Sequence, residues 1–369
     1  MPKIAPRPNL SVIREVVEVT GGVDTHADTH TVAALDQLGG LLGTATFPAT
    51  GPGYQHLVDW LGRHGPLGRV GVEGTGSYGA GLARHLSAAQ QAVVEVNRPN
   101  RADRRARGKS DPQDAINAAR AVLAGTATAT PKTRDGVVEA VRVVQTTRRG
   151  AVKARSAALG QFISLLVTAP EAVRAMLRPL TLRGQITAAA GFRPQNVTDP
   201  NQAAKTALKR LARRVQFLDE EIAAADADLQ QLTQHAAPDL RGLFGVGPDA
   251  AAQLLVTAGD NPDRLHSEAS FAALCGTSPV PASSGKTVRY RLNRGGDRQA
   301  NRALHMIMLT RIRAHQPTRD YVQRALARGK TKRDIMRQLK RYLARTVYLT
   351  LTLPPTTIDL PEPKLPTAA

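Results

Sequence analysis

Four acidic residues in the N-terminal third of the sequence have the types and positions needed to hold metal ions. Asp24 ends one short apolar segment, VTGGVD, and Glu73 ends another, RVGVE. Asp111 and Asp114 begin the segment DPQDAINAARAVL, where a spacing of three puts both on one face of a helix. Carboxylates are ligands that suit Mg²⁺, and paired ions stabilise the attacking and leaving oxygens of a phosphoryl displacement. These residues therefore predict a metal site for phosphoryl transfer.

Simpler roles for the same residues stay open at this point. Asp111 and Asp114 could cap the N-terminus of their helix. His26 and His30 flank the first acid and could join the ligands, although solvated turn histidines are the simpler interpretation. A glycine-rich turn at residues 74–79 also matches G-x-G-x-x-G, with Glu95 about twenty residues beyond it, as in a dinucleotide site.

The charge balance favours a polyanionic partner. The chain has 369 residues with 50 Lys and Arg against 30 Asp and Glu, a formal net charge of +20. Such a balance is typical of nucleic-acid-binding proteins, and a generic basic or ribosomal protein is the plain alternative. Only 4 % of the residues are aromatic, so phosphate contacts should matter more than base stacking.

The basic residues are concentrated in two places. One group lies just before Asp111, and the other begins a stretch, 286–345, that holds 18 Lys or Arg against three Asp. The candidates for contacts with a phosphate backbone are Arg98, Arg101, Arg104, Arg105, Lys109, Lys286, Arg289, Arg291, Arg294 and Arg298.

The cysteine content and the hydropathy of the sequence indicate the cellular compartment of the protein. Cys275 is the single cysteine, which excludes an intramolecular disulfide and a cysteine-based zinc site and fits a reducing cytosol. In FAALCG it is expected to be a small buried apolar residue. No apolar run is long enough to cross a membrane, and the first residues lack the apolar core of a signal peptide. We therefore expect a cytoplasmic protein with no membrane contact.

The segments around the acids predict an α/β domain. Three strand-like segments come first, with a turn at Leu38, Gly39 and Gly40 before the third. A helix, a strand, a helix, a strand and a further helix follow. Three meandering strands followed by alternating helices are typical of a ribonuclease-H-like domain, in which strand ends would carry Asp24 and Glu73.

Beyond about residue 127 the pattern becomes helical. Apolar residues repeat in steps of three and four at Leu208, Leu211, Val215, Leu218, Ile222, Ala225, Leu229 and Leu232. This repeat predicts a coiled coil for self-association, or else an amphipathic helix that packs on its own domain. Farther on, LRGLFGVGPDAAAQLLVTAG predicts a helix-hairpin-helix whose Gly245 and Gly247 let backbone N–H groups approach phosphate, with simple helix packing as the alternative.

A second chemical group lies in a loop of the C-terminal region. Ser283 and Ser284 precede Gly285 within SPVPASSGKTVRYRLNRGGDRQANRAL. Alone, a loop serine is a turn residue rather than a nucleophile.

Together the motifs resemble those of one family. GVDTHADTH, VEGTGSYG and KSDPQDA are similar to the three acidic motifs of the DEDD transposases of bacterial insertion sequences, which are bridge-RNA-guided serine recombinases. GLFGVGP and the serine segment are similar to the C-terminal signature of that family. The resemblance extends from about Gly21 to Thr352.

The resemblance implies roles for individual residues. Asp24, Glu73, Asp111 and Asp114 would bind Mg²⁺, or Mn²⁺ in its place, in a RuvC-like domain. Ser284, with Ser283 as the fallback, would attack DNA to give a 5′-phosphoserine intermediate and so conserve the phosphate bond energy.

It also implies partners and an organisation. The partners would be donor and target DNA, a structured bridge RNA, and further copies in a dimer or tetramer joined by the coiled coil, in a bacterial, nucleoid-associated setting. The expected parts are a tail at 1–20, the RuvC-like domain at 21–130, a helical coiled-coil region at 131–235, a C-terminal transposase domain at 236–352 and a disordered tail at 353–369. A metal-dependent Holliday-junction-type nuclease without serine chemistry and a non-enzymatic nucleic-acid-binding scaffold remain as alternatives.

Overall fold

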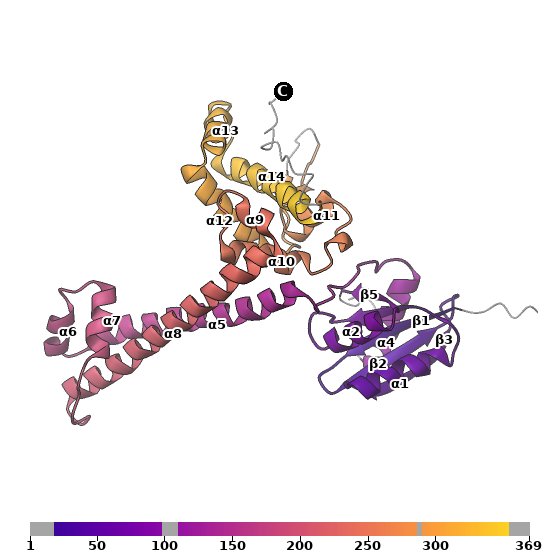
Figure 1. Cartoon of the computed structure of the whole chain (residues 1–369), viewed down its shortest axis with the longest axis horizontal. Coiled ribbons are helices and arrows are strands. Elements are labelled where there is room, and N and C mark those ends of the chain that lie inside the picture. The colour runs from indigo at the N-terminus through magenta and orange to yellow at the C-terminus, as the bar shows by residue number, and fades with distance from the viewer. Residues whose placement is uncertain (1–17, 98–109, 286–289, 354–369) are drawn as a thin grey trace, which may run out of the picture. The chain divides into compact units, whose positions relative to one another are not determined.

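The computed structural model describes residues 18–97, 110–285 and 290–353, and the chain divides into two compact units after Asp135 (Figure 1). The N-terminal unit contains a five-stranded sheet in the order β3-β2-β1-β4-β5. Its strands are β1 (Val19–Thr25), β2 (Thr29–Leu35), β3 (Leu41–Pro48), β4 (Leu67–Glu73) and β5 (Ala92–Val96). Strands β1 and β3 run antiparallel to β2 between them, and β4 and β5 run parallel to β1.

This mixed sheet is consistent with the predicted ribonuclease-H-like fold. The turn before β3 lies where the sequence predicted it, and Gly39 takes a φ of 84° there. The antiparallel meander also argues against the dinucleotide-binding alternative, which needs a succession of parallel strands.

Helices cover both faces of the sheet. Helices α1 (Gly51–Gly62) and α2 (Ala80–Ala88) bury Leu57, Leu61, Leu82 and Leu86 on one face with the strand valines. Helix α4 (Asp111–Leu123) packs on the other face against Val94 and Val96 of β5.

Glycine lets α4 lie very close to the sheet. A Cβ atom added to Gly22 of β1 would stand 2.2 Å from the backbone nitrogen of Ala119 and 2.3 Å from the carbonyl oxygen of Ala115. One added to Gly71 of β4 would lie 2.7 Å from the Val122 side chain. Because side chains alternate along a strand, Gly22 and Gly71 also define which strand residues face α4.

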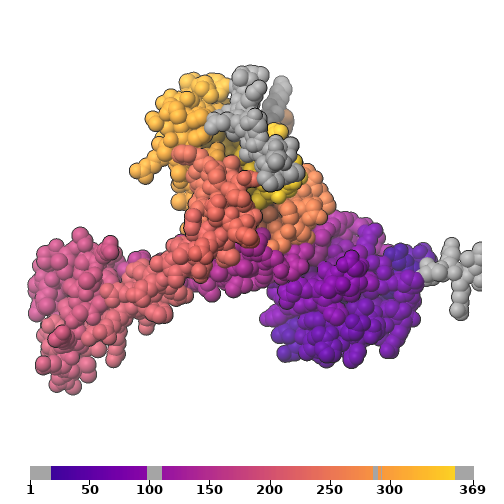
Figure 2. All heavy atoms as spheres, viewed as in Figure 1, coloured from indigo at the N-terminus to yellow at the C-terminus, as the bar shows by residue number. Residues whose placement is uncertain are grey.

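The C-terminal unit begins with a long helical hairpin. Helices α5 (Val137–Thr168) and α8 (Pro200–Ala236) run antiparallel, with α6 (Glu171–Leu177) and α7 (Leu182–Ala190) between them in sequence. Ion pairs from Arg148 to Asp226 and from Arg155 to Asp219 fix the antiparallel direction. Figure 2 shows the hairpin as a narrow arm that α6 and α7 thicken at its tip.

The apolar repeat of α8 is used within the chain. Leu208 and Val215 pack in a core with Phe162 of α5 and Ile186 of α7, and Leu229 packs with Val141 of α5. Of the two interpretations of this apolar stripe, α8 therefore fits the amphipathic helix that packs on its own domain rather than a coiled coil for self-association.

The rest of the C-terminal unit is mostly helical. Its elements are α9 (Pro238–Gly242), α10 (Pro248–Ala258), η1 (Pro262–Arg264), α11 (Glu268–Leu274), β6 (Pro279–Pro281), β7 (Tyr290–Leu292), α12 (Arg298–Ala314), α13 (Gln316–Ala327) and α14 (Lys332–Thr352). They enclose one apolar core around Leu254, Phe271 and Leu304, and Cys275 is buried in it as predicted. Within the described ranges, no helix combines the length and apolar character needed to cross a bilayer.

Candidate functional site

Two of the predicted acids lie at the ends of neighbouring parallel strands. Val23 of β1 is in register with Val72 of β4, so Asp24 and Glu73 follow at the same level. Each lies two residues after a glycine that faces α4, and two residues along a strand return to the same face. The Thr25 hydroxyl donates to the backbone oxygen of Glu73 at 2.9 Å and joins the two strand ends.

The other two acids lie on the first turn of α4. Ser110 is the N-cap residue, so Asp111 and Asp114 stand inside the helix rather than at the predicted capping position. Asp114 is buried, and Asp111 is half-buried. The close approach of α4 to Gly22 brings this turn over the face that carries Asp24.

His26 joins the acidic residues. Its Nε2 lies 3.2 Å from Oδ2 of Asp24 and 3.3 Å from Oδ1 of Asp111. One ligand atom from each of these three residues lies within 4.8 Å of the others, a spacing that a single metal ion could bridge. This group contains two of the four predicted acids, and Glu73 and Asp114 are not among its members. The interpretation of His26 as a solvated turn residue is incomplete, because its ring contacts both carboxylates.

The electrostatics of Asp24 favour a cation. The residue is 7 % exposed, and its Oδ2 is buried and accepts no hydrogen bond among the described residues. The His26 contact has an ion-pair distance without hydrogen-bond geometry. Burial raises the pKa of Asp24; the nearby His26 lowers it, and the charges of Asp114 and Asp111 raise it further. A divalent ion would relieve both the desolvation and the repulsion, so the donor set fits a divalent cation.

His30 lies on the opposite face of the sheet. It pairs in register with Thr25, its ring stacks on Tyr54 of α1 at 5.5 Å, and it is fully buried. Burial also lowers its pKa. The expectation of a solvated turn histidine is wrong here, because β2 continues through this residue and α1 covers it.

The serines lie in the C-terminal unit, whereas the acids lie in the N-terminal unit. Ser283 and Ser284 are exposed between β6 and β7, and Gly285 follows with a φ of 55°. Strands β6 and β7 pair from Pro279 to Leu292 as a short antiparallel hairpin.

The predicted phosphate contacts are only partly described. Arg98, Arg101, Arg104, Arg105, Lys109, Lys286 and Arg289 lie outside the described residues. Arg291 on β7, Arg294 in the following turn and Arg298 at the start of α12 are all exposed.

The two glycines of the predicted hairpin line a basic pocket. Gly245 has a φ of 81° between α9 and α10, and Gly247 caps α10 without a side-chain hydrogen bond. Both glycines line a pocket of about 810 Å³ that also contains Arg148, Arg149, Lys153 and Arg302.

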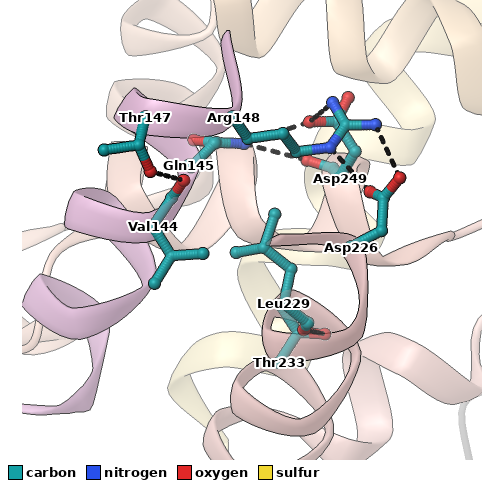
Figure 3. Close-up of polar contacts among 8 residues, drawn as sticks. All are labelled: Val144, Gln145, Thr147, Arg148, Asp226, Leu229, Thr233 and Asp249. Carbon is teal, nitrogen blue, oxygen red and sulfur yellow. Dashed lines mark hydrogen bonds and ion pairs between the residues drawn. The ribbon is translucent and has the colours of Figure 1, made fainter. Parts of the chain in front are cut away.

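Arg148 ties three helices together at this pocket. Its side chain reaches from α5 to Asp226 of α8 at 2.6 Å and to Asp249 of α10 at 3.3 Å (Figure 3). Gln145 donates to the backbone oxygen of Asp249 at 3.1 Å. The start of α10 is therefore fixed to the base of the hairpin.

Family profiles match two separate regions of the chain, of which the first continues past Asp135 through α5 of the C-terminal unit. A profile of IS110-type DEDD transposases matches residues 21–169, which include all four acids. A profile described as the transposase IS116/IS110/IS902 family matches residues 237–323, which include the serines. The two regions are thus similar to transposase domains of the IS110 type, in agreement with the resemblance of the motifs.

Two curated relatives come from insertion elements. The chain is 33 % identical over 134 residues to the insertion element IS110 uncharacterized 43.6 kDa protein of Streptomyces coelicolor, which covers 36 % of this chain and 33 % of the relative. It is 30 % identical over 166 residues to the insertion element IS900 uncharacterized 42 kDa protein of Mycobacterium paratuberculosis, covering 43 % of this chain and 42 % of that relative. The aligned parts span about a third and two fifths of these relatives.

Proposed function

We propose that the protein is a DNA transposase that cuts and exchanges the strands of an insertion sequence by phosphoryl transfer. The observation that carries this proposal is the convergence of Asp24, Asp111 and His26 at the end of β1, in a domain matched by a DEDD transposase profile. Donor and target DNA are the substrates, and the surplus of basic residues supplies contacts to their phosphates.

In this mechanism the acids would hold the metal, and the metal would bind the phosphate. Asp24, Glu73, Asp111 and Asp114 would provide the carboxylates, as the shared sheet face and the first turn of α4 allow. Bound Mg²⁺, or Mn²⁺, would polarise the scissile phosphate and stabilise charge that develops on its oxygens. His26 orients Asp24 and Asp111 through the contacts of its Nε2.

Ser284 is the proposed nucleophile, with Ser283 next to it as the fallback. Its Oγ bonds to phosphorus as the bond from phosphorus to the 3′ oxygen breaks, and the departing strand receives a proton to become a 3′-hydroxyl. In strand exchange a new 3′-hydroxyl attacks the phosphorus of the 5′-phosphoserine, the bond from phosphorus to Oγ breaks and the serine regains a proton, so that no ATP is required.

We propose further partners for this chemistry. A structured bridge RNA pairs with donor and target DNA, and subunits of a dimer or tetramer combine the acids of one copy with the serine of another. Since α5 already covers the apolar stripe of α8, such an assembly would use other surfaces of the hairpin. A bacterial cytoplasm with access to the nucleoid is the matching location.

Single substitutions test the two chemical roles separately. We expect Asp24→Asn to abolish strand exchange and to remove Mg²⁺-induced stabilisation, because a buried ligand oxygen is lost. The matched control is Asp59→Asn, which changes the same charge on an exposed position of α1.

Ser284→Ala should abolish exchange and the covalent DNA adduct while Mg²⁺ stabilisation persists. Exchange that survives in the Ser283→Ala/Ser284→Ala double variant would contradict serine chemistry.

A junction nuclease is the second candidate, because the acidic group forms within the N-terminal unit alone. In that case the double serine variant would still cleave Holliday junctions in Mg²⁺ while Asp24→Asn would not. A non-enzymatic scaffold would tolerate all of these changes. Guide use is tested by adding or omitting the non-coding RNA of the element and measuring recombination.

A further inference from the structure

A second basic pocket lies beside the serine hairpin in the C-terminal unit. Its volume is about 720 Å³, and its walls come from the segment after α11, from β7 and from the first half of α14. The lining residues that carry charge or an aromatic face include Tyr290, Arg291, Arg337, Lys340, Arg341 and Tyr342. The volume is in the range of pockets that bind small ligands.

Lys340 is the unusual residue of this pocket. It is 7 % exposed, and its Nζ donates to Oδ1 of Asn301 at 2.7 Å. No carboxylate of the described residues lies within ion-pair distance of that ammonium. A buried ammonium without a counter-ion is unfavourable, and burial lowers the pKa of Lys340, with a smaller contribution from the charge of Arg337.

The contact to Asn301 is held in one orientation. The Asn301 amide nitrogen donates to the backbone oxygens of Cys275 and Gly276 at 3.0 and 2.9 Å. Its oxygen is therefore directed at Lys340, which keeps the ammonium at the pocket rather than in solvent. Because the amide carries no negative charge, it leaves the ammonium without a counter-ion, and an anion in the pocket would supply one.

The neighbouring cations strengthen the preference for an anion. Arg337 is paired with Asp334 at 3.3 Å and Arg341 with Glu268 at 3.2 Å, so each acid partly neutralises its arginine, and Lys340 is a cation without a carboxylate partner among the described residues. Arg291 adds an exposed guanidinium from β7, the strand that ends the serine hairpin. Among the described residues that line the pocket, one is acidic, Asp334, and four are basic.

We propose that this pocket binds a phosphodiester group of the nucleic-acid backbone, with Lys340 as the buried cation that contacts the phosphate. The proposal rests on the function proposed above, since a phosphate held here would fix a strand next to the hairpin of Ser283 and Ser284. Tyr290 and Tyr342 offer faces on which the adjoining sugar or base can lie.

Binding of a labelled DNA duplex in EDTA, over a series of KCl concentrations, tests this assignment without any catalytic step. We expect Lys340→Met to weaken binding about tenfold and to reduce the slope of log affinity against log salt by about one, as loss of one phosphate contact does. Lys340→Arg should restore most of both. Lys332→Met, which removes an exposed charge from the start of the same helix outside the pocket, is the matched control.

The other outcomes would overturn the proposal. An equal loss in Lys332→Met would show a general charge effect. A lower melting temperature of Lys340→Met with unchanged affinity and slope would show a purely structural lysine. Inorganic phosphate that stabilises the wild type but not Lys340→Met, with duplex binding unchanged, would identify free phosphate as the ligand. Failure of the transposase mechanism is distinguishable, because strand exchange that persists in Asp24→Asn or in Ser283→Ala/Ser284→Ala would contradict that mechanism while leaving the duplex affinity and its salt slope unchanged.

Discussion

At the residue scale, Asp24 shows how burial prepares a side chain for a metal. A carboxylate with a buried oxygen that accepts no hydrogen bond lowers the stability of the apo fold. His26 and a nearby acidic turn surround it, so that binding of a cation recovers part of that free energy. The sequence could group Asp24 with Asp111, but it left open whether His26 is a ligand or a solvated turn residue. Strand ends and helix starts are visible in a sequence, whereas the direction of a turn side chain depends on what packs around it.

Cys275 provides a pH-dependent prediction. Burial, with a smaller contribution from Asp297, raises the pKa of its thiol to about 12. In the unfolded chain the thiol loses its proton near pH 9, while the folded chain keeps it, so the stability contributed by this group is complete below pH 9 and falls as pH rises. Between pH 8 and 10 we expect the wild type to lose about 1 to 2 kcal/mol more unfolding free energy than Cys275→Ala.

Urea unfolding at the two pH values measures this difference. A companion measurement is alkylation of the native protein at pH 8, which should modify Cys275 only after urea unfolds the C-terminal unit. Rapid alkylation of the folded protein, or an equal pH dependence in both proteins, would contradict the prediction.

At the element scale, α4 takes its position from two glycines rather than from large apolar side chains. Gly22 and Gly71 leave the space that the alanines of α4 occupy, and this contact carries Asp111 and Asp114 to the sheet. The order of strands and helices could be predicted because each element has its own apolar period. The distance of α4 from the sheet could not, because a glycine in a strand gives no sign of which helix approaches it.

A matched pair of glycine substitutions tests this packing. Gly22→Ala would force a Cβ against the backbone of α4, and we expect it to destabilise the N-terminal unit by about 2 to 3 kcal/mol and to weaken Mg²⁺ binding. Gly62→Ala, at the end of α1 with open space around it, should change stability by less than about 1 kcal/mol, in the stabilising direction. Thermal unfolding with and without Mg²⁺ measures both effects. Equal stability of the two variants would show that α4 does not depend on this contact.

Also at this scale, the apolar repeat in α8 does not by itself predict which helix packs against it. An apolar stripe with a seven-residue repeat specifies that a helix needs a partner, but it does not say whether that partner is in the same chain. The deciding information lies in α5, whose Val141, Ala158 and Phe162 supply the opposing surface. These residues are spread over a long helix without an equally regular repeat.

For the whole molecule, the division after Asp135 separates the two proposed chemical groups. The acids fold with the sheet of the N-terminal unit, and the serines fold with the helical C-terminal unit. Both regions could be recognised from local motifs. Their mutual placement has no comparable signal, because it depends on the DNA and subunits that the proposed function requires.

Calorimetry tests the independence of the units. We expect two unfolding transitions, of which Mg²⁺ raises only the one that Gly22→Ala lowers. The rise should be about 10 °C when Mg²⁺ is present at about 100 times its Kd, because binding to the folded state alone stabilises it. Asp24→Asn should abolish this rise, and Asp59→Asn should retain it. A single transition would mean that the two units unfold together, and an equal rise in both transitions would mean that the metal also stabilises the C-terminal unit.

The apolar packing between α5 and α8 has a consequence for how insertion elements diversify. Because the arm is held together by its own residues, it can fold on one polypeptide before any encounter with another copy. Its outer residues, such as Phe217, which is 65 % exposed, remain free to vary without loss of the arm itself. If copies assemble as proposed, recognition between them could therefore change from one insertion element to the next, and elements that share a host genome could avoid forming mixed complexes.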